Sequence, residues 1–187
     1  MDDEELWRAY AWPQRSLRVN FVTSIDGHIQ GPDGLSGPLS GPEDRRLFHM
    51  LRAGCDAVLV GAGTARTETY RPIRIKPEWE RFRSRDTPPD LVIVSASGNV
   101  PDIEGARVVD GTDMPGLREE YPRILCEGGP ALFAALLAAG LVDEFAWSIA
   151  GRVGGSGQLL TGNPRAHATP KHTHFTAEGV FTLWDIT

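Results

Sequence analysis

The chain has 187 residues, 41% of them hydrophobic and 24% charged, which predicts one globular domain over residues 1–187. The net charge is −6 with no run of Lys or Arg, and this argues against a nucleic-acid partner. The longest apolar stretch, residues 131–142, is too short to cross a membrane, and the acidic N-terminus differs from a secretory signal. Only two cysteines occur, Cys55 and Cys126, so we expect a cytoplasmic protein without disulfides or a CxxC zinc site.

Strands and helices are expected to alternate along the chain. In chain order the predicted elements are a polar N-terminal arm (1–16), a strand (17–23), a loop (24–40), a helix that ends at Gly54, a strand (57–60), a short helix (62–68), a loop (72–89), strands at 91–94, 106–110 and 124–126, a helix (130–139), a strand (145–150) and a hairpin (172–176 with 180–186). Short continuous apolar runs are typical of parallel strands buried on both faces. The pattern predicts an α/β domain in three layers, with a mostly parallel central sheet between helices and a C-terminal antiparallel hairpin.

The helix that ends at Gly54 has start and stop signals. Ser40 and Glu43 have the spacing of a capping box, and Pro42 falls in the first turn. Gly54 is expected to end the helix in a left-handed conformation. Arg52 lies in the last turn, where it either complements the helix dipole or faces a pocket and binds a phosphate or carboxylate.

A glycine turn follows the predicted strand over 57–60, in the order Gly61, Ala62, Gly63, Thr64. Glycines at the end of a strand let a ligand approach the backbone, and a helix start offers N–H donors to a phosphate. The alternative interpretation is a tight strand–helix turn with Thr64 as its cap. The sequence alone leaves both open.

A second glycine turn follows the strand that ends at Cys126. Gly128 and Gly129 open a helix whose first residue is Pro130, an arrangement that exposes backbone N–H groups and suits a pyrophosphate. Glu127 would be a poor phosphate ligand, but it can accept a hydrogen bond from a base or sugar. A carboxylate favoured by the helix dipole is the alternative. We favour a ligand site, because a Gly-Gly helix opening is costly unless something approaches it.

Two further groups are ambiguous. Asp26 and Gly27 directly follow the first predicted strand, where such a pair is commonly only a turn. His172 and His174 would share one face of a strand and could chelate a metal. Because solvent-facing histidines on an edge strand are more common, we predict no metal site.

Four segments occur together in a characteristic order. They are V-T-S-I-D-G (22–27), L-R-A-G-C-D-A-V-L-V-G-A-G-T (51–64), L-V-I-V-S (91–95) and E-G-G-P-A-L-F-A-A-L-L-A-A-G-L-V-D-E (127–144). Together they resemble the pyrimidine reductase domain of riboflavin biosynthesis, which forms the C-terminal part of bifunctional deaminase-reductases. That family belongs to the dihydrofolate-reductase-like superfamily. The resemblance covers residues 17–187.

The resemblance implies a dihydrofolate-reductase-like sheet, NADPH as cofactor, a small pyrimidine substrate and a homodimer. The implied reaction reduces 5-amino-6-(5-phosphoribosylamino)uracil or a related pyrimidine, by hydride transfer from nicotinamide C4 to ribose C1′ of the ring-opened imine. The cofactor would contact Gly61, Thr64, Arg66, Glu68, Ser95 or Ser97, Gly128, Gly129, Pro130, Ala131 and Leu132. The substrate would contact Asn20, Ser36, Arg52 and Glu127. Glu127 and Asp26 are the candidate catalytic residues, with Asp26 or water relaying a proton.

The chain departs from the family pattern in several places. Asn20 stands where a Lys is common, and Pro38 stands where an aromatic residue often follows the Ser36 loop. The usual acidic pair and Pro after the first glycine turn are replaced by residues 68–72. That region helps to hold the substrate phosphate in the family. Arg71 or Arg74 is our candidate substitute.

Two rival functions remain open. One is reduction of dihydrofolate, for which Asp44 on the predicted helix is the candidate carboxylate. Its alternative role is a first-turn acid that serves the helix dipole. The other rival is a non-catalytic NADP(H)-binding protein, which the altered loop around Ser36 favours slightly.

Overall fold

The computed structural model describes residues 1–83, 85–160 and 165–187. The strands are β1 (Ser16–Thr23), β2 (His28–Gln30), β3 (Ala57–Gly61), β4 (Asp90–Val94), β5 (Arg107–Val109), β6 (Arg123–Cys126), β7 (Glu144–Ala150), β8 (Ser156–Leu159), β9 (Ala168–Thr176) and β10 (Gly179–Ile186). The helices are α1 (Asp3–Ala9), α2 (Pro42–Gly54), α3 (Ala62–Thr67), α4 (Pro77–Glu80), α5 (Met114–Glu120), α6 (Pro130–Ala138) and the short 3₁₀ turn η1 (Gly111–Asp113).

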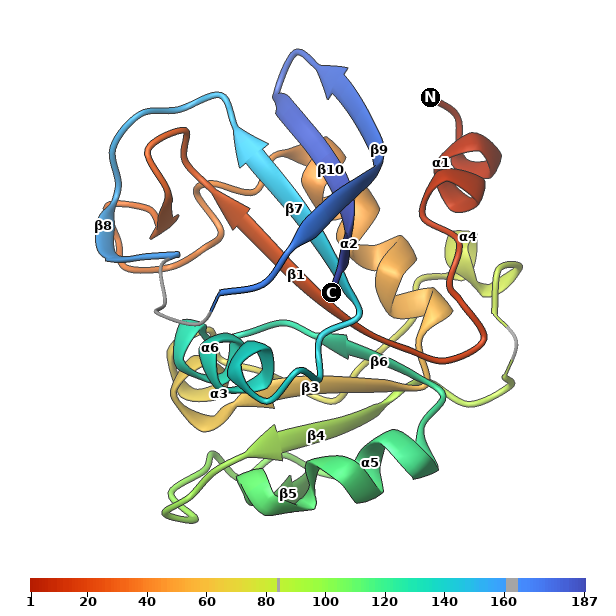
Figure 1. Ribbon diagram of the computed structural model, residues 1–187, viewed down its shortest axis with the longest axis vertical. Helices are drawn as coiled ribbons and strands as arrows, with labels where there is room; N and C mark the ends of the chain where they lie inside the picture. The colour runs from red at the N-terminus through yellow and green to blue at the C-terminus, as the bar shows by residue number, and fades with distance from the viewer. Residues whose placement is uncertain (84, 161–164) are drawn as a thin grey trace.

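One sheet of eight strands forms the centre of the molecule, in the order β5-β4-β3-β6-β1-β7-β10-β9 (Figure 1). The strands from β5 to β7 run parallel, whereas β10 runs antiparallel to both β7 and β9. A two-stranded ribbon of β2 and β8 accompanies it. This arrangement confirms the predicted fold class, including the C-terminal antiparallel hairpin.

Alternating side chains of the parallel strands divide the hydrophobic core into two layers. The layer toward α1, α2 and α4 includes Leu6, Leu47, Met50, Val58, Leu91 and Trp79. The layer toward α5 and α6 includes Leu17, Val19, Leu59, Leu117, Ile124 and Leu136. The sheet is therefore buried on both faces, as the continuous apolar runs indicated. None of the described helices has the length and hydrophobicity needed to cross a membrane.

The N-terminal arm over 1–16 contains a helix that the sequence analysis did not predict. The carboxylate of Asp2 accepts a hydrogen bond from the backbone N–H of Glu5, and the Glu5 side chain reciprocates, forming a capping box. Leu6 and Tyr10 are fully buried in the core. The arm is thus an integral part of the fold, because its two inward-facing side chains lie one helical turn apart.

A buried ion pair joins this arm to the sheet. Arg18 on β1 and Glu144 on β7 are 0% and 1% exposed, and the guanidinium donates two hydrogen bonds to one carboxylate oxygen, at 2.7 and 2.9 Å. Arg18 also donates to the backbone carbonyls of Tyr10 and Ala11, at 2.8 and 3.0 Å. The second Glu144 oxygen accepts from Lys171 on β9 at 2.7 Å. The network satisfies both buried charges, as burial requires.

The capping box predicted for α2 does not form, and this prediction was wrong. The helix begins after Gly41, which has no side-chain cap. The backbone N–H of Glu43 instead donates to the carboxylate of Glu178, 3.0 Å away on the turn between β9 and β10. The Ser40 hydroxyl donates to Asp44 at 2.5 Å. A carboxylate from a distant turn therefore takes the place of the local cap.

The predicted left-handed stop at Gly54 was also wrong. Gly54 is the last residue of α2, and its φ is not positive. A Cβ atom at this position would collide with the indole ring of Trp12. The glycine is needed for close approach of the N-terminal arm rather than for a left-handed turn.

Several short elements fall where none was predicted. β2 lies in the loop expected over 24–40, and α4 lies in the loop expected over 72–89. α5 and β8 were not predicted either. Strands and helices of three or four residues are too short for a hydrophobic period to reveal. In α5 the sequence Met114, Pro115, Gly116 reads as a turn, although Pro is tolerated in a first helical turn.

The Arg18–Glu144 pair gives a stability prediction. Glu144→Gln keeps the side-chain shape but leaves the Arg18 charge without its counter-ion in the interior, so we expect a loss of about 3–5 kcal/mol in the free energy of unfolding. The measurement is urea unfolding followed by circular dichroism. Glu120→Gln is the control, because its ion pair with Arg107 is about half exposed and should contribute less than about 1 kcal/mol. Equal losses in the two variants would contradict the prediction.

Candidate functional site

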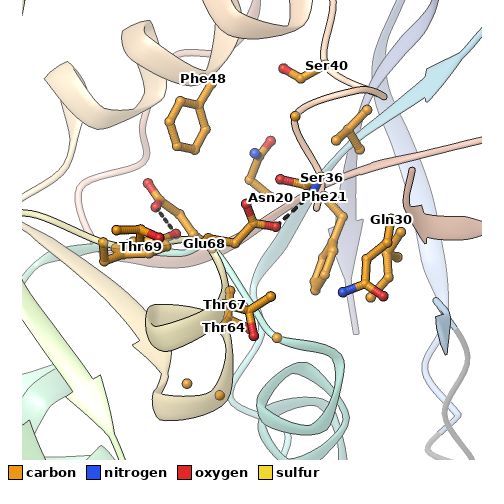
Figure 2. A pocket seen from close by; sticks show the side chains of 18 of the residues that line it. Asn20, Phe21, Gln30, Ser36, Ser40, Phe48, Thr64, Thr67, Glu68 and Thr69 are labelled. Atoms are coloured by element: carbon orange, nitrogen blue, oxygen red, sulfur yellow. Dashed lines mark hydrogen bonds between the residues drawn. The ribbon is translucent and has the colours of Figure 1, made fainter. Parts of the chain in front are cut away.

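A cavity of about 970 Å³ opens at the carboxyl ends of β1, β3 and β6 (Figure 2). Ligands in open parallel sheets bind at this edge. The cavity is bounded by α2, α3, the start of α6 and the loop between β2 and α2. The residues predicted for the site that line it are Asn20, Ser36, Arg52, Gly61, Thr64, Glu68, Glu127, Gly129, Pro130, Ala131 and Leu132.

The two predicted glycine turns contact each other. The backbone N–H of Gly61 donates to the carbonyl of Gly128 at 2.7 Å. Gly128 has a φ of +93°, and a Cβ there would meet the Phe21 ring, so this position needs glycine. A Cβ on Gly129 would collide with the hydroxyl of Thr64. The turns therefore form one continuous backbone surface, which neither segment alone would present.

The helix α6 begins at this surface. Its N-cap, Gly129, offers no side-chain acceptor, and Pro130 occupies the first helical position. The N–H groups of Ala131 and Leu132 are in the first turn, where an α-helix supplies no carbonyl partners. A helix start of this kind favours an anion such as a phosphate.

A buried ion pair lies on the cavity wall. Arg52 on α2 donates two hydrogen bonds of 2.6 Å to the two oxygens of Glu127, whose side chain is 2% exposed. Tyr70 donates a third bond of 2.6 Å to Glu127. Burial disfavours the charge on Arg52, but the carboxylate outweighs burial and raises the Arg52 pKa above its ordinary value. Burial and the Glu127 charge raise the Tyr70 pKa well above 10.

Tyr70 and Phe48 were not predicted to belong to the site. The guanidinium of Arg52 stacks over the Phe48 ring at 4.2 Å from its centroid, and the Tyr70 ring lies at 5.8 Å. The available signal was an aromatic residue within the polar segment 68–72. Its contact with Glu127, 57 residues later, depends on the chain path and could not be read locally.

The loop before α2 is tied across the cavity to the end of α3. The backbone N–H of Ser36 donates to the carboxylate of Glu68 at 2.8 Å, as a dashed line in Figure 2 shows. Glu68 is the C-cap residue of α3. A predicted substrate residue and a predicted cofactor residue thus hold each other in place.

Three further arginines line the cavity, and two of them, Arg71 and Arg74, are the candidates predicted from the sequence. Arg45, Arg71 and Arg74 are exposed side chains on the lining. Among the described residues, they have no ion-pair or hydrogen-bond partner. Since Arg52 is neutralised by Glu127, these three are the lining arginines whose charge is available to a ligand, on a lining that also carries Asp44 and Glu68.

Asp44 also lines the cavity, from the first turn of α2, and is 7% exposed. It accepts the hydrogen bond from Ser40 and has no ion-pair partner among the described residues. Burial and the nearby Glu178 charge raise its pKa, while the hydrogen bond from Ser40 opposes the shift.

Asp26 lies outside the cavity lining, in the turn between β1 and β2. Its carboxylate accepts hydrogen bonds from the Ser24 hydroxyl at 2.6 Å and from the Gly154 N–H at 2.9 Å. These two bonds lower its pKa to about 2. The carboxylate therefore ties the β1–β2 turn to the segment after β7, and its catalytic role stays a prediction.

Arg66, Ser95 and Ser97 are also absent from the lining. Arg66 on α3 donates to the backbone carbonyl of Asn99, and the Asn99 N–H donates to the Ser97 hydroxyl at 3.4 Å. Ser95 follows β4 and pairs with Val109 through its backbone N–H. These residues form a polar group at the same carboxyl edge of the sheet, one strand beyond the cavity.

His172 and His174 face inward from β9, contrary to the expectation of a solvent-facing pair. Their rings are half-buried and pack against Tyr10, with Nε2 of His172 3.2 Å from Nδ1 of His174. Burial lowers the pKa of both, that of His174 to about 4. Across the described ranges, no group of three or more His, Cys, Asp or Glu side chains is placed to hold a metal ion.

The strand order, the helices on both faces and the cavity at the carboxyl edge define a dihydrofolate-reductase-like α/β protein, as the sequence predicted. Residues 15–183 match the family described as the RibD C-terminal domain, and the chain belongs to this family. The resemblance drawn from the four sequence segments is thereby confirmed.

One relative and two solved structures of similar fold can be compared with the chain. The 2,5-diamino-6-ribosylamino-4(3H)-pyrimidinone 5′-phosphate reductase of Methanothermobacter thermautotrophicus is 31% identical over 175 residues, covering 76% of this chain and 81% of the relative. The structure of a pyrimidine reductase-like protein from Corynebacterium diphtheriae has a TM-score of 0.81 at 21% identity, covering 97% of this chain and 98% of the other. Dihydrofolate reductase from Enterococcus faecalis complexed with NADP(H) has a TM-score of 0.67 at 14% identity, covering 93% and 98%. The two structures show the shared fold.

The contact between the glycine turns can be tested by stability. Gly129→Ala places a methyl group against the Thr64 hydroxyl, so we expect a loss of about 1–3 kcal/mol in the free energy of unfolding. Gly63→Ala is the matched control, because a Cβ there meets nothing within 4 Å, and alanine in a helix gains about 0.5–1 kcal/mol. Adding Thr64→Ala to Gly129→Ala should restore part of the loss. Urea unfolding of the four proteins decides the matter, and no difference between the two single variants would refute the contact.

Proposed function

We propose that the chain is an NADPH-dependent reductase of 5-amino-6-(5-phosphoribosylamino)uracil or a closely related pyrimidine, with hydride transfer to ribose C1′ of the ring-opened imine. The observation that carries this proposal is the single cavity that brings the two glycine turns together with the Arg52–Glu127 pair. The named relative from Methanothermobacter thermautotrophicus is a reductase of a ribosylaminopyrimidinone phosphate, which supports the substrate class.

The residues present fit a dinucleotide cofactor. The cradle formed by Gly128, Gly129 and Thr64 has no room for another side chain, and the α6 start offers free N–H groups to a pyrophosphate. Arg66 and Ser97, one strand further, are the proposed partners of a 2′-phosphate, which would select NADPH over NADH. When bound, the cofactor supplies the hydride, and the protein contributes orientation and exclusion of water.

The pyrimidine is proposed to bind between α2 and the Ser36 loop. Glu127 keeps free acceptor capacity on Oε1, which accepts one hydrogen bond, whereas Oε2 already accepts two. It is therefore suited to receive N–H groups of a base or hydroxyl groups of a ribityl chain. Asn20 lines the same cavity and supplies both donors and an acceptor. The bond between Ser36 and Glu68 holds the loop over this end of the cavity.

The substrate phosphate is proposed to bind Arg71 and Arg74, with Arg45 facing it from α2. These side chains lack protein counter-ions among the described residues, and guanidinium groups match phosphate geometry. They occupy the segment in which the chain departs from the family pattern. The departure thus replaces one phosphate-binding arrangement by another.

A homodimer and a cytoplasmic location remain proposals. β9 is an edge strand of the sheet, and its Phe175 is 75% exposed. An exposed aromatic residue on a sheet edge is a feature that association would bury. The resemblance to the family adds to this argument.

The direct test of the function is the loss of NADPH absorbance with the pyrimidine phosphate and with dihydrofolate, run in parallel. We expect oxidation with the pyrimidine phosphate and none with dihydrofolate, and slower oxidation when NADH replaces NADPH. If dihydrofolate instead oxidises NADPH, and Asp44→Asn abolishes this reaction, the dihydrofolate reductase hypothesis would be established. NADPH binding without oxidation by either compound would identify a non-catalytic binding protein.

The phosphate assignment gives a separate prediction. Arg71→Ala and Arg74→Ala each remove a charge-assisted hydrogen bond worth about 1.5–3 kcal/mol, so KM for the phosphorylated substrate should rise about tenfold or more while kcat changes little. The dephosphorylated riboside should show no such change. Arg8→Ala, an exposed arginine on α1, is the control. An unchanged KM in the double variant would refute the assignment.

A further inference from the structure

Tyr70 makes a contact with Glu127 that the Arg52–Glu127 ion pair does not require. Arg52 donates one hydrogen bond of 2.6 Å to each oxygen of Glu127, and this fork already fixes the plane of the carboxylate and neutralises its charge. The Tyr70 hydroxyl donates a further bond of 2.6 Å to Oε2. Since a hydroxyl adds no charge, its effect is on which oxygen of Glu127 stays open to a ligand.

The acceptor positions of Glu127 can be counted. An ionised carboxylate offers about two acceptor positions on each oxygen. Oε1 accepts from Nε of Arg52, whereas Oε2 accepts both from Nη2 of Arg52 and from Tyr70. Oε2 is therefore filled, and one position remains on Oε1. Glu127, Arg52 and Tyr70 all line the cavity, so a ligand there meets this single position.

The Tyr70 hydroxyl keeps its proton, so it acts as a donor to Glu127. Burial and the neighbouring Glu127 charge raise the Tyr70 pKa well above 10. The Arg52 charge acts in the opposite direction but does not offset them. The bond to Oε2 is thus present at every pH near neutrality.

The backbone before Tyr70 has an unusual conformation. Thr69, on the cavity lining (Figure 2), has a φ of +52°, in the left-handed region that is unfavourable for a β-branched residue. The chain reverses here at the end of α3, and the Tyr70 N–H donates to the carbonyl of Ala65 at 3.0 Å, as in a Schellman motif. Strain of this kind persists where the surrounding contacts determine the geometry. The reversal brings the Tyr70 hydroxyl to Glu127.

The number of open acceptor positions affects which ligands fit. Two parallel N–H donors need both oxygens of a carboxylate, as an arginine fork does, whereas an isolated donor needs only one. The two ribosylaminopyrimidine phosphates differ in this way at their C2–N3 edge. In the uracil the N3–H is isolated between two carbonyls, and in the 2,5-diaminopyrimidinone it lies beside the amino group on C2.

We propose that Tyr70 determines specificity through Glu127: by filling Oε2 it leaves a single acceptor for the C2–N3 edge of the base, which favours the uracil over the C2-amino compound. Tyr70 is a positioning residue, because it touches Glu127 and not the reacting atoms. A second N–H donor would meet the Tyr70 hydroxyl and lose its acceptor, which weakens binding about tenfold or more. The relative from Methanothermobacter thermautotrophicus is named for the C2-amino compound, so the two proteins would differ in substrate. The inference rests on the proposed function, since it concerns the substrate of the same site.

The test measures binding of the two pyrimidine phosphates by isothermal titration calorimetry in the presence of NADP⁺. In the native protein we expect the uracil to bind about tenfold or more tightly. Tyr70→Phe keeps the ring but reopens Oε2, so the ratio of the two dissociation constants should fall about fivefold or more. The affinity for NADP⁺ should stay native. Tyr121→Phe, the same change at a buried tyrosine outside the lining, is the control and should keep the native ratio.

A double variant separates an effect through Glu127 from a general structural effect. Glu127→Gln removes the carboxylate on which Tyr70 acts, so adding Tyr70→Phe to it should change the ratio less than about twofold. Independent, additive effects of the two changes would overturn the inference. If the double variant does not fold, Tyr70→Phe alone decides the matter, because it keeps the ion pair.

Turnover of NADPH separates this inference from the proposed function. Reduction of either pyrimidine, with a native preference for the C2-amino compound or with an unchanged ratio in Tyr70→Phe, would overturn the inference and leave the proposed function intact. Binding with the expected change in ratio but without oxidation of NADPH would support the role of Tyr70 and remove the proposed reaction. Failure of both compounds to bind would overturn both.

Discussion

The buried ion pair between Arg18 and Glu144 is the interaction on which the rest of the structure depends. It joins two neighbouring parallel strands, reaches the edge strand through Lys171, and holds the N-terminal arm by its backbone carbonyls. Such a pair adds little net stability compared with a well-packed apolar core, but it accepts few alternative arrangements. The register of β1 against β7, with Arg18 opposite Glu144, also fixes where Asn20 and the carboxyl end of β1 meet the cavity.

A second buried ion pair, Arg52 with Glu127, serves the opposite purpose. The Arg18–Glu144 pair is buried inside the fold. The Arg52–Glu127 pair lines the cavity, where a ligand would contact two charges that already neutralise each other. The other charged side chains of the cavity lining differ in whether they have a counter-ion. Among the described residues, three lining arginines (Arg45, Arg71 and Arg74) have no counter-ion, a neutralised pair lies on the wall, and Asp44 has no ion-pair partner. One cavity therefore presents cationic side chains together with a buried carboxyl group that has no counter-ion among the described residues.

The sequence predicted the parts of the fold that depend on local pattern. Continuous apolar runs identified the central strands, and glycines after two of them identified the turns that meet at the cavity. What it missed depends on distant partners. The cap of α2 comes from Glu178, on a turn 135 residues beyond Glu43, and the role of Tyr70 appears only once Glu127 is beside it. Short elements such as β2 and α4 have too few residues to show a hydrophobic periodicity. The roles of the site residues follow from the same long-range contacts.

The position of β1 has a consequence for how the chain folds. β1 is the first strand in sequence but lies in the middle of the sheet, between β6 and β7. Ser16 of β1 pairs with Arg123 of β6, and Arg18 of β1 pairs with Glu144 of β7. During synthesis both edges of β1 stay unpaired until more than a hundred further residues have been made. Loops of this length give a high contact order, which places the protein among slowly folding topologies. The cavity lies where β1 meets β6, so it is completed only when the late-synthesised strands have paired. Until then the unpaired apolar strands of the sheet are exposed and need protection from aggregation.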